Sequence, residues 1–129
     1  TYIEPFFGGG ATFIKASQIN PNANFVINDI NHFIIGIYQA IKSDLQPFLD
    51  KMDELSAKYL PLSKVDRKKF YFDLRKEYAF QYTKWNKTEE SAVLYFLMKT
   101  GFNGIWQINK NTNNRFGTPA GLLNQTDSV

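Results

Sequence analysis

The chain has 129 residues, of which 43% are hydrophobic and none is cysteine, and its formal net charge is +3. This length and hydrophobic content are typical of one globular domain and exclude a disordered chain, a disulfide-stabilised protein and a thiolate metal site. Because no apolar run reaches the roughly 18 residues of a membrane span and the start lacks a signal peptide's basic region, we expect a cytoplasmic protein with no membrane partner.

The first elements along the chain predict a strand–helix–strand unit. Residues 1–4 have the pattern of a short strand, residues 11–18 of a short helix, and residues 25–28 of a second apolar strand that ends at Asp29. Connections of this kind between neighbouring parallel strands are nearly always right-handed. We therefore predict an α/β fold of the Rossmann-like type in this part of the chain.

The pattern from residue 31 to residue 98 is helical. Asn31 is suited to cap a helix over residues 31–42, and residues 45–59 form the next candidate. A third helix is predicted to begin at Ser63 and to carry an aromatic stripe at steps of three and four residues. The stripe consists of Tyr71, Leu74, Tyr78, Tyr82 and Trp85. A fourth helix is predicted to begin at Thr88.

Glycine and asparagine dominate the chain from Thr100 onward. Short alternating pieces around residues 105–108 and Phe116 predict a loop followed by a hairpin. Residues 109–114 are polar and predict an exposed turn.

Three consecutive glycines, residues 8–10, lie where the first strand passes into the first helix. Glycine allows the backbone to approach a ligand closely, and the start of the helix offers free N–H groups. Asp29 ends the next strand about 20 residues later, where dinucleotide-binding folds place the carboxylate that binds ribose hydroxyls. These features predict an adenosine-type ligand at the carboxyl edge of a parallel sheet.

The glycine pattern also indicates which adenosine ligand fits. The nicotinamide dinucleotide fingerprint requires glycine at position 13, which is Phe13, and no phosphate-binding Gly-Lys-Ser/Thr sequence is present. S-adenosylmethionine lacks a pyrophosphate, and Glu4 and Asp29 are suited to its cationic and hydroxyl groups. Two alternatives stay open, namely a glycine-rich turn without a ligand and a Rossmann-like enzyme that uses another nucleotide.

Five segments, YIEPFFGGGA, INDIN, FYFDLRKEY, FLMKTGFNGIWQIN and FGTPAG, occur in this order. Together they resemble the Dam-type adenine-N6 DNA methyltransferases over nearly the whole chain. The resemblance implies part of a Rossmann-like S-adenosylmethionine-dependent methyltransferase fold with an inserted helical target-recognition domain. It divides the chain into a partial cofactor-binding domain, residues 1–44, and the target-recognition domain with its DNA-reading loop and hairpin, residues 45–129.

The resemblance also implies binding residues and partners. The expected cofactor-binding residues are Glu4, Pro5, Phe6, Gly8, Gly9, Gly10, Asp29 and Ile30. The expected DNA-binding residues are Lys99, Gly101, Phe102, Asn103, Gly104, Trp106, Gln107, Asn109, Arg115 and Pro119. The expected partners are double-stranded DNA and a cognate restriction endonuclease. Residues 64–129 carry 11 Lys/Arg and 6 Asp/Glu, which suits a polyanion, although a lysine-rich solvated helix face gives the same count. The candidates for phosphate contacts in this half are Lys68, Lys69, Arg75, Lys76, Lys84, Lys99, Lys110 and Arg115.

Two departures from the family pattern limit what the chain is expected to do. Gln107 stands where the family has arginine, and glutamine pairs better with adenine than with guanine, so a recognition sequence other than GATC is allowed. The catalytic Asp-Pro-Pro-Tyr is absent, since no two of the five prolines are adjacent. We therefore expect no catalytic residue and no metal site, and a fragment that cannot methylate alone. The alternative is a catalytically inactive DNA-binding module of the same fold.

Overall fold

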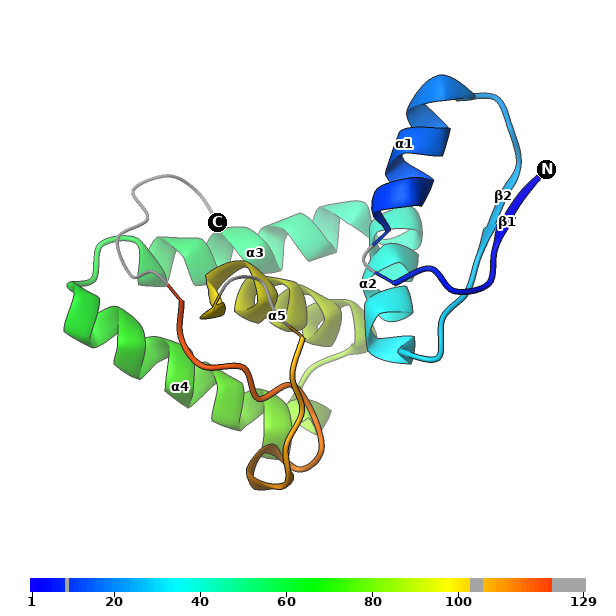
Figure 1. Ribbon diagram of the computed structural model, residues 1–129. Coiled ribbons are helices and arrows are strands. Elements are labelled where there is room, and N and C mark those ends of the chain that lie inside the picture. Colours follow the sequence, from blue (N-terminus) through cyan, green and yellow to red (C-terminus); the bar gives the residue numbers. More distant parts are fainter. Residues whose placement is uncertain (9, 103–105, 122–129) are drawn as a thin grey trace.

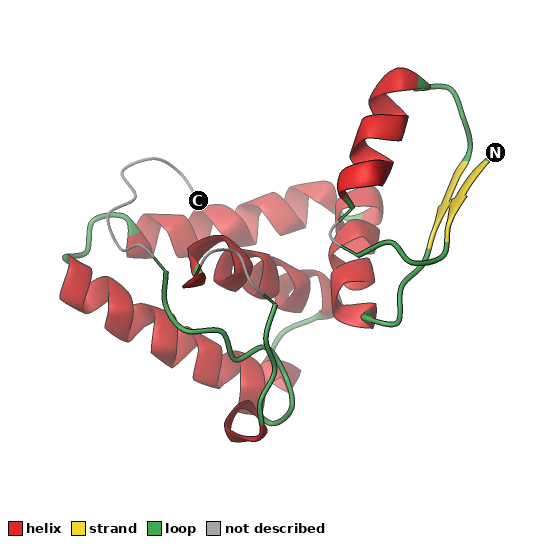
Figure 2. Cartoon of the chain, in the orientation of Figure 1, coloured by secondary structure: helices red, strands yellow, loops and turns green. Residues whose placement is uncertain are grey.

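The computed structural model describes residues 1–8, 10–102 and 106–121, and this part of the chain is mostly helical with one small sheet (Figures 1 and 2). The strands are β1 (Tyr2–Glu4) and β2 (Phe25–Ile27). The α-helices are α1 (Ala11–Ile19), α2 (His32–Ser43), α3 (Leu45–Tyr59), α4 (Lys64–Phe80) and α5 (Lys87–Thr100). Two short 3₁₀ helices, η1 (Tyr82–Lys84) and η3 (Lys110–Thr112), complete the elements.

β1 and β2 pair in parallel, with Tyr2 opposite Phe25 and Glu4 opposite Ile27, so the predicted strand–helix–strand unit is confirmed. The crossover helix α1 covers one face of the pair through Phe13, whose ring centroid lies 5.4 Å from that of Phe25. The side chains that alternate with these, Ile3 and Val26, are 66% and 53% exposed. Each strand therefore shows the alternation expected of a sheet covered on one face.

α2 connects the strand pair to the other helices, as Figure 1 shows. Its cap is the one predicted, because the Asn31 side chain accepts hydrogen bonds from the backbone N–H groups of Phe33 and Ile34. Toward the remaining helices, α2 contributes Ile37 and Ala40 to the main hydrophobic core. The core thus continues across position 44, and the domain boundary expected there stays a prediction.

α3, α4 and α5 enclose most of the core. The bounds predicted for α3 are confirmed, and Ser63 caps α4 by accepting a hydrogen bond from the Asp66 backbone N–H. Large aromatic side chains fill the centre, and the rings of Tyr59 and Phe96, both 0% exposed, meet edge to face at 5.4 Å. Close packing of such rings supplies much of the burial free energy of a small domain.

Two predicted helix boundaries were wrong, namely the end of α4 and the start of α5. α4 ends at Phe80, so Tyr82 lies in η1 and Trp85 in the connection to α5. α5 begins earlier than predicted, because Asn86 and Glu89 form a reciprocal capping box. Thr88 is instead buried, and its hydroxyl donates to the Asp44 carboxylate at 2.9 Å.

The chain after α5 returns along itself. Residues 101–121, which the family resemblance predicts to contact DNA, are called the DNA-reading segment below. Antiparallel bridges join Gly101 to Ala120 and Ile108 to Phe116, which gives the predicted hairpin a minimal form with η3 at its turn. Thr112 in that turn is buried rather than exposed, because its hydroxyl bonds within the turn, including the Arg115 carbonyl at 3.0 Å. Within the described ranges, no helix has the length and apolarity needed to cross a membrane.

Candidate functional site

The carboxylate of Asp29 joins the two loops that follow β1 and β2. Its Oδ2 accepts a hydrogen bond from the Gly8 backbone N–H and its Oδ1 from the Asn31 backbone N–H, each at 2.8 Å. The bond from Asn31, followed by that from Gly8, holds the pKa of this carboxyl below its usual value. Asp29 is therefore ionised at neutral pH, and each oxygen keeps capacity to accept a further hydrogen bond.

Gly8 and Gly10 both have left-handed backbones, with φ of 59° and 86°. Around Gly8, no atom of the described residues beyond its chain neighbours lies within 4 Å of the position that a Cβ would take, so this side of the loop is open to close approach by a ligand. Gly10 instead faces inward, toward the ring of Phe7 and the hydroxyl of Tyr38. Glycine at position 8 thus leaves an open surface, whereas glycine at position 10 allows tight packing.

The two loops that Asp29 joins also carry exposed apolar side chains. Ile30 is 99% exposed and Phe6 is 89% exposed, which is unusual for side chains of this size. An exposed apolar surface suits an adenine ring, and an adjacent carboxylate suits ribose hydroxyls. The residues of this edge therefore fit the adenosine part of S-adenosylmethionine.

The structure brings most of the predicted cofactor-binding residues to the carboxyl edge of the strand pair. Those that lie there are Glu4, Pro5, Phe6, Gly8, Gly10, Asp29 and Ile30. Gly9 lies outside the described residues. The Glu4 carboxylate accepts a hydrogen bond from the Tyr2 hydroxyl at 3.4 Å.

Gly10→Ala is expected to lower the free energy of unfolding by about 1–3 kcal/mol, since a side chain at this left-handed position requires a disfavoured backbone conformation. The added Cβ would also lie 2.6 Å from Cζ of Phe7. Urea denaturation followed by circular dichroism measures the change. Gly36→Ala in α2 is the matched control, because outside its own helix the added Cβ would meet only Ser91 Oγ of α5 among the described residues, at an ordinary contact distance of 3.5 Å. Equal effects of the two substitutions would contradict the inward packing of Gly10.

The predicted DNA-binding residues divide into exposed and internal ones. The exposed ones are Lys99, Phe102, Gln107, Asn109 and Pro119. Gly101 is buried, and Trp106 is half-buried between the rings of Phe33 and Phe116, at centroid distances of 6.0 and 5.4 Å. Asn103 and Gly104 lie outside the described residues.

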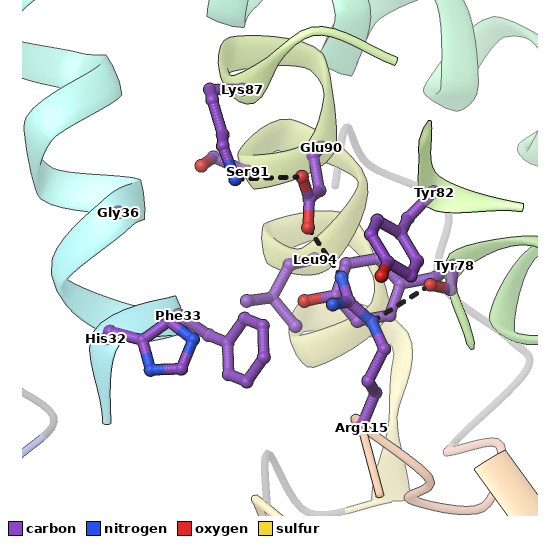
Figure 3. A pocket seen from close by; sticks show the side chains of 10 residues that line it. All are labelled: His32, Phe33, Gly36, Tyr78, Tyr82, Lys87, Glu90, Ser91, Leu94 and Arg115. Carbon is purple, nitrogen blue, oxygen red and sulfur yellow. Dashed lines mark hydrogen bonds and ion pairs between the residues drawn. The ribbon is translucent and has the colours of Figure 1, made fainter. Parts of the chain in front are cut away.

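The location of Arg115 differs from the expectation of a phosphate contact. Figure 3 shows its guanidinium beside Glu90 and Tyr82, at one side of a pocket of about 270 Å³ that α2, α4 and α5 line. Its Nη2 donates to Glu90 Oε1 at 2.5 Å and its Nε to the Tyr78 carbonyl at 3.1 Å. The guanidinium also lies 3.9 Å from the centroid of the Tyr82 ring. Because Arg115 is only 9% exposed, its charge is balanced inside the protein.

Two side chains of α4 hold the far end of the DNA-reading segment. The Tyr71 hydroxyl donates to the Thr118 carbonyl at 2.7 Å, and Arg75 Nη1 donates to the Gly117 carbonyl at 3.0 Å. Burial raises the pKa of Tyr71 well above its usual value, so the hydroxyl stays a donor. Sequence reasoning missed this role of the two residues, although both lie in the FYFDLRKEY segment that carries the family resemblance.

Backbone hydrogen bonds complete the positioning of the segment. The Phe102 N–H donates to the Pro119 carbonyl at 2.9 Å, and the Gly117 N–H donates to the Gln107 carbonyl at 2.7 Å. Gln107 is thus held across from the residues that α4 fixes, with its side chain exposed. In the part of the chain that the structure describes, no cluster of three or more His, Asp or Glu could hold a metal ion.

Comparison with known proteins identifies the family. Residues 1–124 match the D12 class N6 adenine-specific DNA methyltransferases, and the chain belongs to this family. This finding confirms the family that the sequence motifs indicated.

Several curated methyltransferases are similar to the chain. It is 31% identical over 120 residues to the Type II methyltransferase M.MjaIII of Methanocaldococcus jannaschii, covering 93% of this chain and 41% of that protein. It is 28% identical to the Type II methyltransferase M1.LlaDCHI of Lactococcus lactis, covering 93% and 38%. It is 24% identical to the DNA adenine methylase of Salmonella typhi, covering 83% and 34%. The chain therefore spans about two fifths or less of the length of these relatives.

Proposed function

We propose that the chain is the cofactor-holding and DNA-reading part of a site-specific methyltransferase that moves a methyl group from S-adenosylmethionine to N6 of adenine in duplex DNA. The observation that carries this proposal is the pair of hydrogen bonds from Gly8 and Asn31 to Asp29 at the edge of two parallel strands. In this proposal, residues 1–44 belong to a Rossmann-like methyltransferase domain and residues 45–129 to an inserted target-recognition domain.

The proposed cofactor site is built from two kinds of group. Asp29 accepts hydrogen bonds from the ribose hydroxyls, while Ile30 and Phe6 cover the adenine ring. Glu4 lies at the end of β1, where its carboxylate suits the ammonium group of the amino-acid tail. S-adenosylmethionine supplies an electrophilic methyl group on its sulfonium when it is bound. The loop residues contribute by fixing the orientation of the ligand.

The proposed DNA site uses the exposed residues of the DNA-reading segment. Gln107 is suited to pair with adenine in the major groove, and Lys99 is suited to a phosphate. Phe102 is 50% exposed and offers an apolar side chain to the base stack. The Type II names of two relatives support a cognate restriction endonuclease as a further partner.

The chemistry at N6 requires groups that these 129 residues do not supply. The N6 lone pair is conjugated into the adenine ring, so the base must leave the duplex and donate its amino hydrogens to acceptors before N6 can attack. In the family that task belongs to Asp-Pro-Pro-Tyr, which this sequence lacks. The same observation favours the second candidate function, a catalytically inactive DNA-binding module.

Calorimetric titration with S-adenosylmethionine tests the cofactor site. We expect the chain to bind it and to leave NAD unbound, and Asp29→Asn to weaken binding at least about tenfold, because a charged acceptor is lost. Asp50→Asn on α3 is the matched control, since Asp50 is an exposed carboxylate that bonds only its neighbour Gln46 in the described structure. The pKa of Asp29 is lowered in the folded chain, so Asp29 also contributes to the free energy of unfolding. This contribution is complete above the ordinary carboxyl pKa and is lost as the pH falls through the lowered pKa. Binding of NAD in place of S-adenosylmethionine would contradict the proposal.

The same preparation tests whether the chain is a methyltransferase by itself. With S-adenosylmethionine and a pool of duplexes of random sequence, we expect no transfer of labelled methyl groups to DNA. Transfer by the 129-residue chain alone would contradict the assignment of a fragment, and it would also remove the inactive module as an alternative.

A further inference from the structure

A groove of about 300 Å³ lies between the outer side of α4 and the turn of the DNA-reading segment. The residues that line it are Phe72, Asp73, Arg75, Lys76 and Phe80 of α4, with Asn111 and Thr112 of η3. None of them belongs to the cofactor edge. Arg75 and Lys76 are among the basic residues that the sequence offers as candidate phosphate contacts, and the other five carry no predicted binding role. The groove is therefore a separate surface that the site described above leaves unexplained.

The two walls of the groove are fixed relative to one another. The Asn113 side-chain amide donates to the Ala79 carbonyl at 3.0 Å, which holds η3 against the end of α4. The guanidinium of Arg75 lies 4.7 Å from the centroid of the Phe72 ring, and its Nη1 donates to the Gly117 carbonyl, which ties α4 to the chain that follows the turn. The groove is thus preformed, so a ligand that enters it needs little reorganisation of the protein.

The charges around the groove are positive. The one carboxylate in its lining, Asp73, is paired with Lys69 at 2.8 Å. Lys76 lines the groove, and Lys110 is the first residue of η3, directly before the lining residue Asn111. Both are exposed, and neither forms an ion pair with any residue that the structure describes. Arg75 likewise has no ion pair with a described residue, so the lining and the first residue of η3 carry three cations without a paired carboxylate.

Phe80 adds an apolar side chain to this basic groove. It is 55% exposed at the end of α4, four residues after Lys76. Cations beside an exposed apolar side chain match the backbone of a nucleic acid, in which anionic phosphates alternate with largely apolar sugars.

We propose that this groove binds the phosphate backbone of duplex DNA beside the base pairs that the DNA-reading segment contacts. The inference rests on the proposed DNA-binding function. η3 is the turn of the same segment that carries Gln107 and Asn109, so a duplex contacted by those residues continues past the turn toward α4. Lys76 and Lys110 supply phosphate contacts, and Phe80 covers a deoxyribose. These contacts carry no sequence preference.

The salt dependence of DNA binding tests the groove directly. The probe is a fluorescent 30-base-pair duplex of mixed sequence, and the dissociation constant of the chain is measured by anisotropy between 50 and 200 mM salt. For each lost phosphate contact, the slope of log K against log salt is expected to fall by about 0.9. The double variant Lys76→Gln/Lys110→Gln should therefore reduce the slope by about 1.8, so that the fourfold rise in salt costs about twelvefold less affinity than in the unchanged chain.

The control is Lys15→Gln/Lys42→Gln, which removes the same charge from exposed positions on α1 and α2. This variant should retain the slope of the unchanged chain. Phe80→Ser should weaken binding by a similar factor at every salt concentration, because no ion is released at an apolar contact. Circular dichroism of each variant verifies that these exposed substitutions leave the helices intact.

The outcomes separate the groove from the proposed function. If the unchanged chain binds the duplex and the groove variant has the same slope as the control, the groove proposal is overturned while the DNA-binding function stands. If the unchanged chain does not bind duplex DNA at 50 mM salt, both are overturned. Equal loss of slope in the two double variants would mean that net charge alone attracts DNA. That result would also overturn the groove proposal, and an acidic protein surface would be the alternative occupant of the groove.

Discussion

Glu90→Ala is expected to lower the free energy of unfolding by about 3–5 kcal/mol, which is the cost of removing one partner from a buried ion pair. The side chains of Glu90 and Arg115 are 13% and 11% exposed. Without Glu90, the guanidinium keeps a carbonyl and aromatic faces around it but loses the charge that balances it. Urea denaturation followed by tryptophan fluorescence measures the difference.

The matched control is Glu54→Ala, because Glu54 pairs with Lys51 and Lys58 at the surface and is 47% exposed. Exposed pairs contribute about 0–1 kcal/mol. The double variant Glu90→Leu/Arg115→Met removes both charges and is expected to be more stable than Glu90→Ala, since replacing a buried pair by apolar side chains is often neutral. A loss for Glu90→Ala no larger than for Glu54→Ala would show that Arg115 does not depend on its partner.

Phe116→Ala is expected to lower the free energy of unfolding by about 3–5 kcal/mol and to weaken DNA binding as well. The side chain is 0% exposed and belongs to the same core cluster as Phe96 and Tyr71. Among the described residues of the DNA-reading segment, Phe116 is the one that belongs to that core, and Trp106 and Ala120 pack against it. Its loss therefore leaves a cavity and removes the side chain that anchors the bridge to Ile108.

Ile108→Ala provides the comparison, because Ile108 is bridged to Phe116 yet is 53% exposed. It should cost less than about 1 kcal/mol, as surface substitutions usually do. Thermal unfolding and duplex binding are measured on the same samples. If Phe116→Ala unfolds like the unchanged chain, the DNA-reading segment does not share the core of the helices.

Local sequence signals were sufficient for the strand–helix–strand unit and for most of the helices. Asn31 and Ser63 cap α2 and α4 as predicted, because such side chains bond to backbone N–H groups within their own first turn. The link from Gly8 to Asp29 was also foreseeable, since the carboxyl ends of adjacent parallel strands meet at one edge. Signals of this kind depend on residues near in sequence or on a familiar strand order.

The positions that sequence reasoning misplaced depend on distant partners. Arg115 follows two asparagines in a polar stretch and has the appearance of a surface residue, but Glu90 lies 25 residues earlier and becomes its partner only after folding. Thr112 is buried for a related reason, since the turn itself satisfies its hydroxyl. The start of α5 is different, because Asn86 and Glu89 carry the spacing of a capping box and could have been recognised.

Because α2 lies between the strand pair and the other helices, ligand binding at the strand pair is linked to the local stability of that pair. The described residues of β1, α1 and β2 contribute nothing to the main core, whereas α2 does. Opening of the strand pair therefore breaks few contacts and leaves the helices folded, so its backbone amides should exchange with solvent long before those of α3 and α5. A molecule held at the Asp29 edge stabilises this loosely protected part, and its affinity includes the free energy of ordering that part.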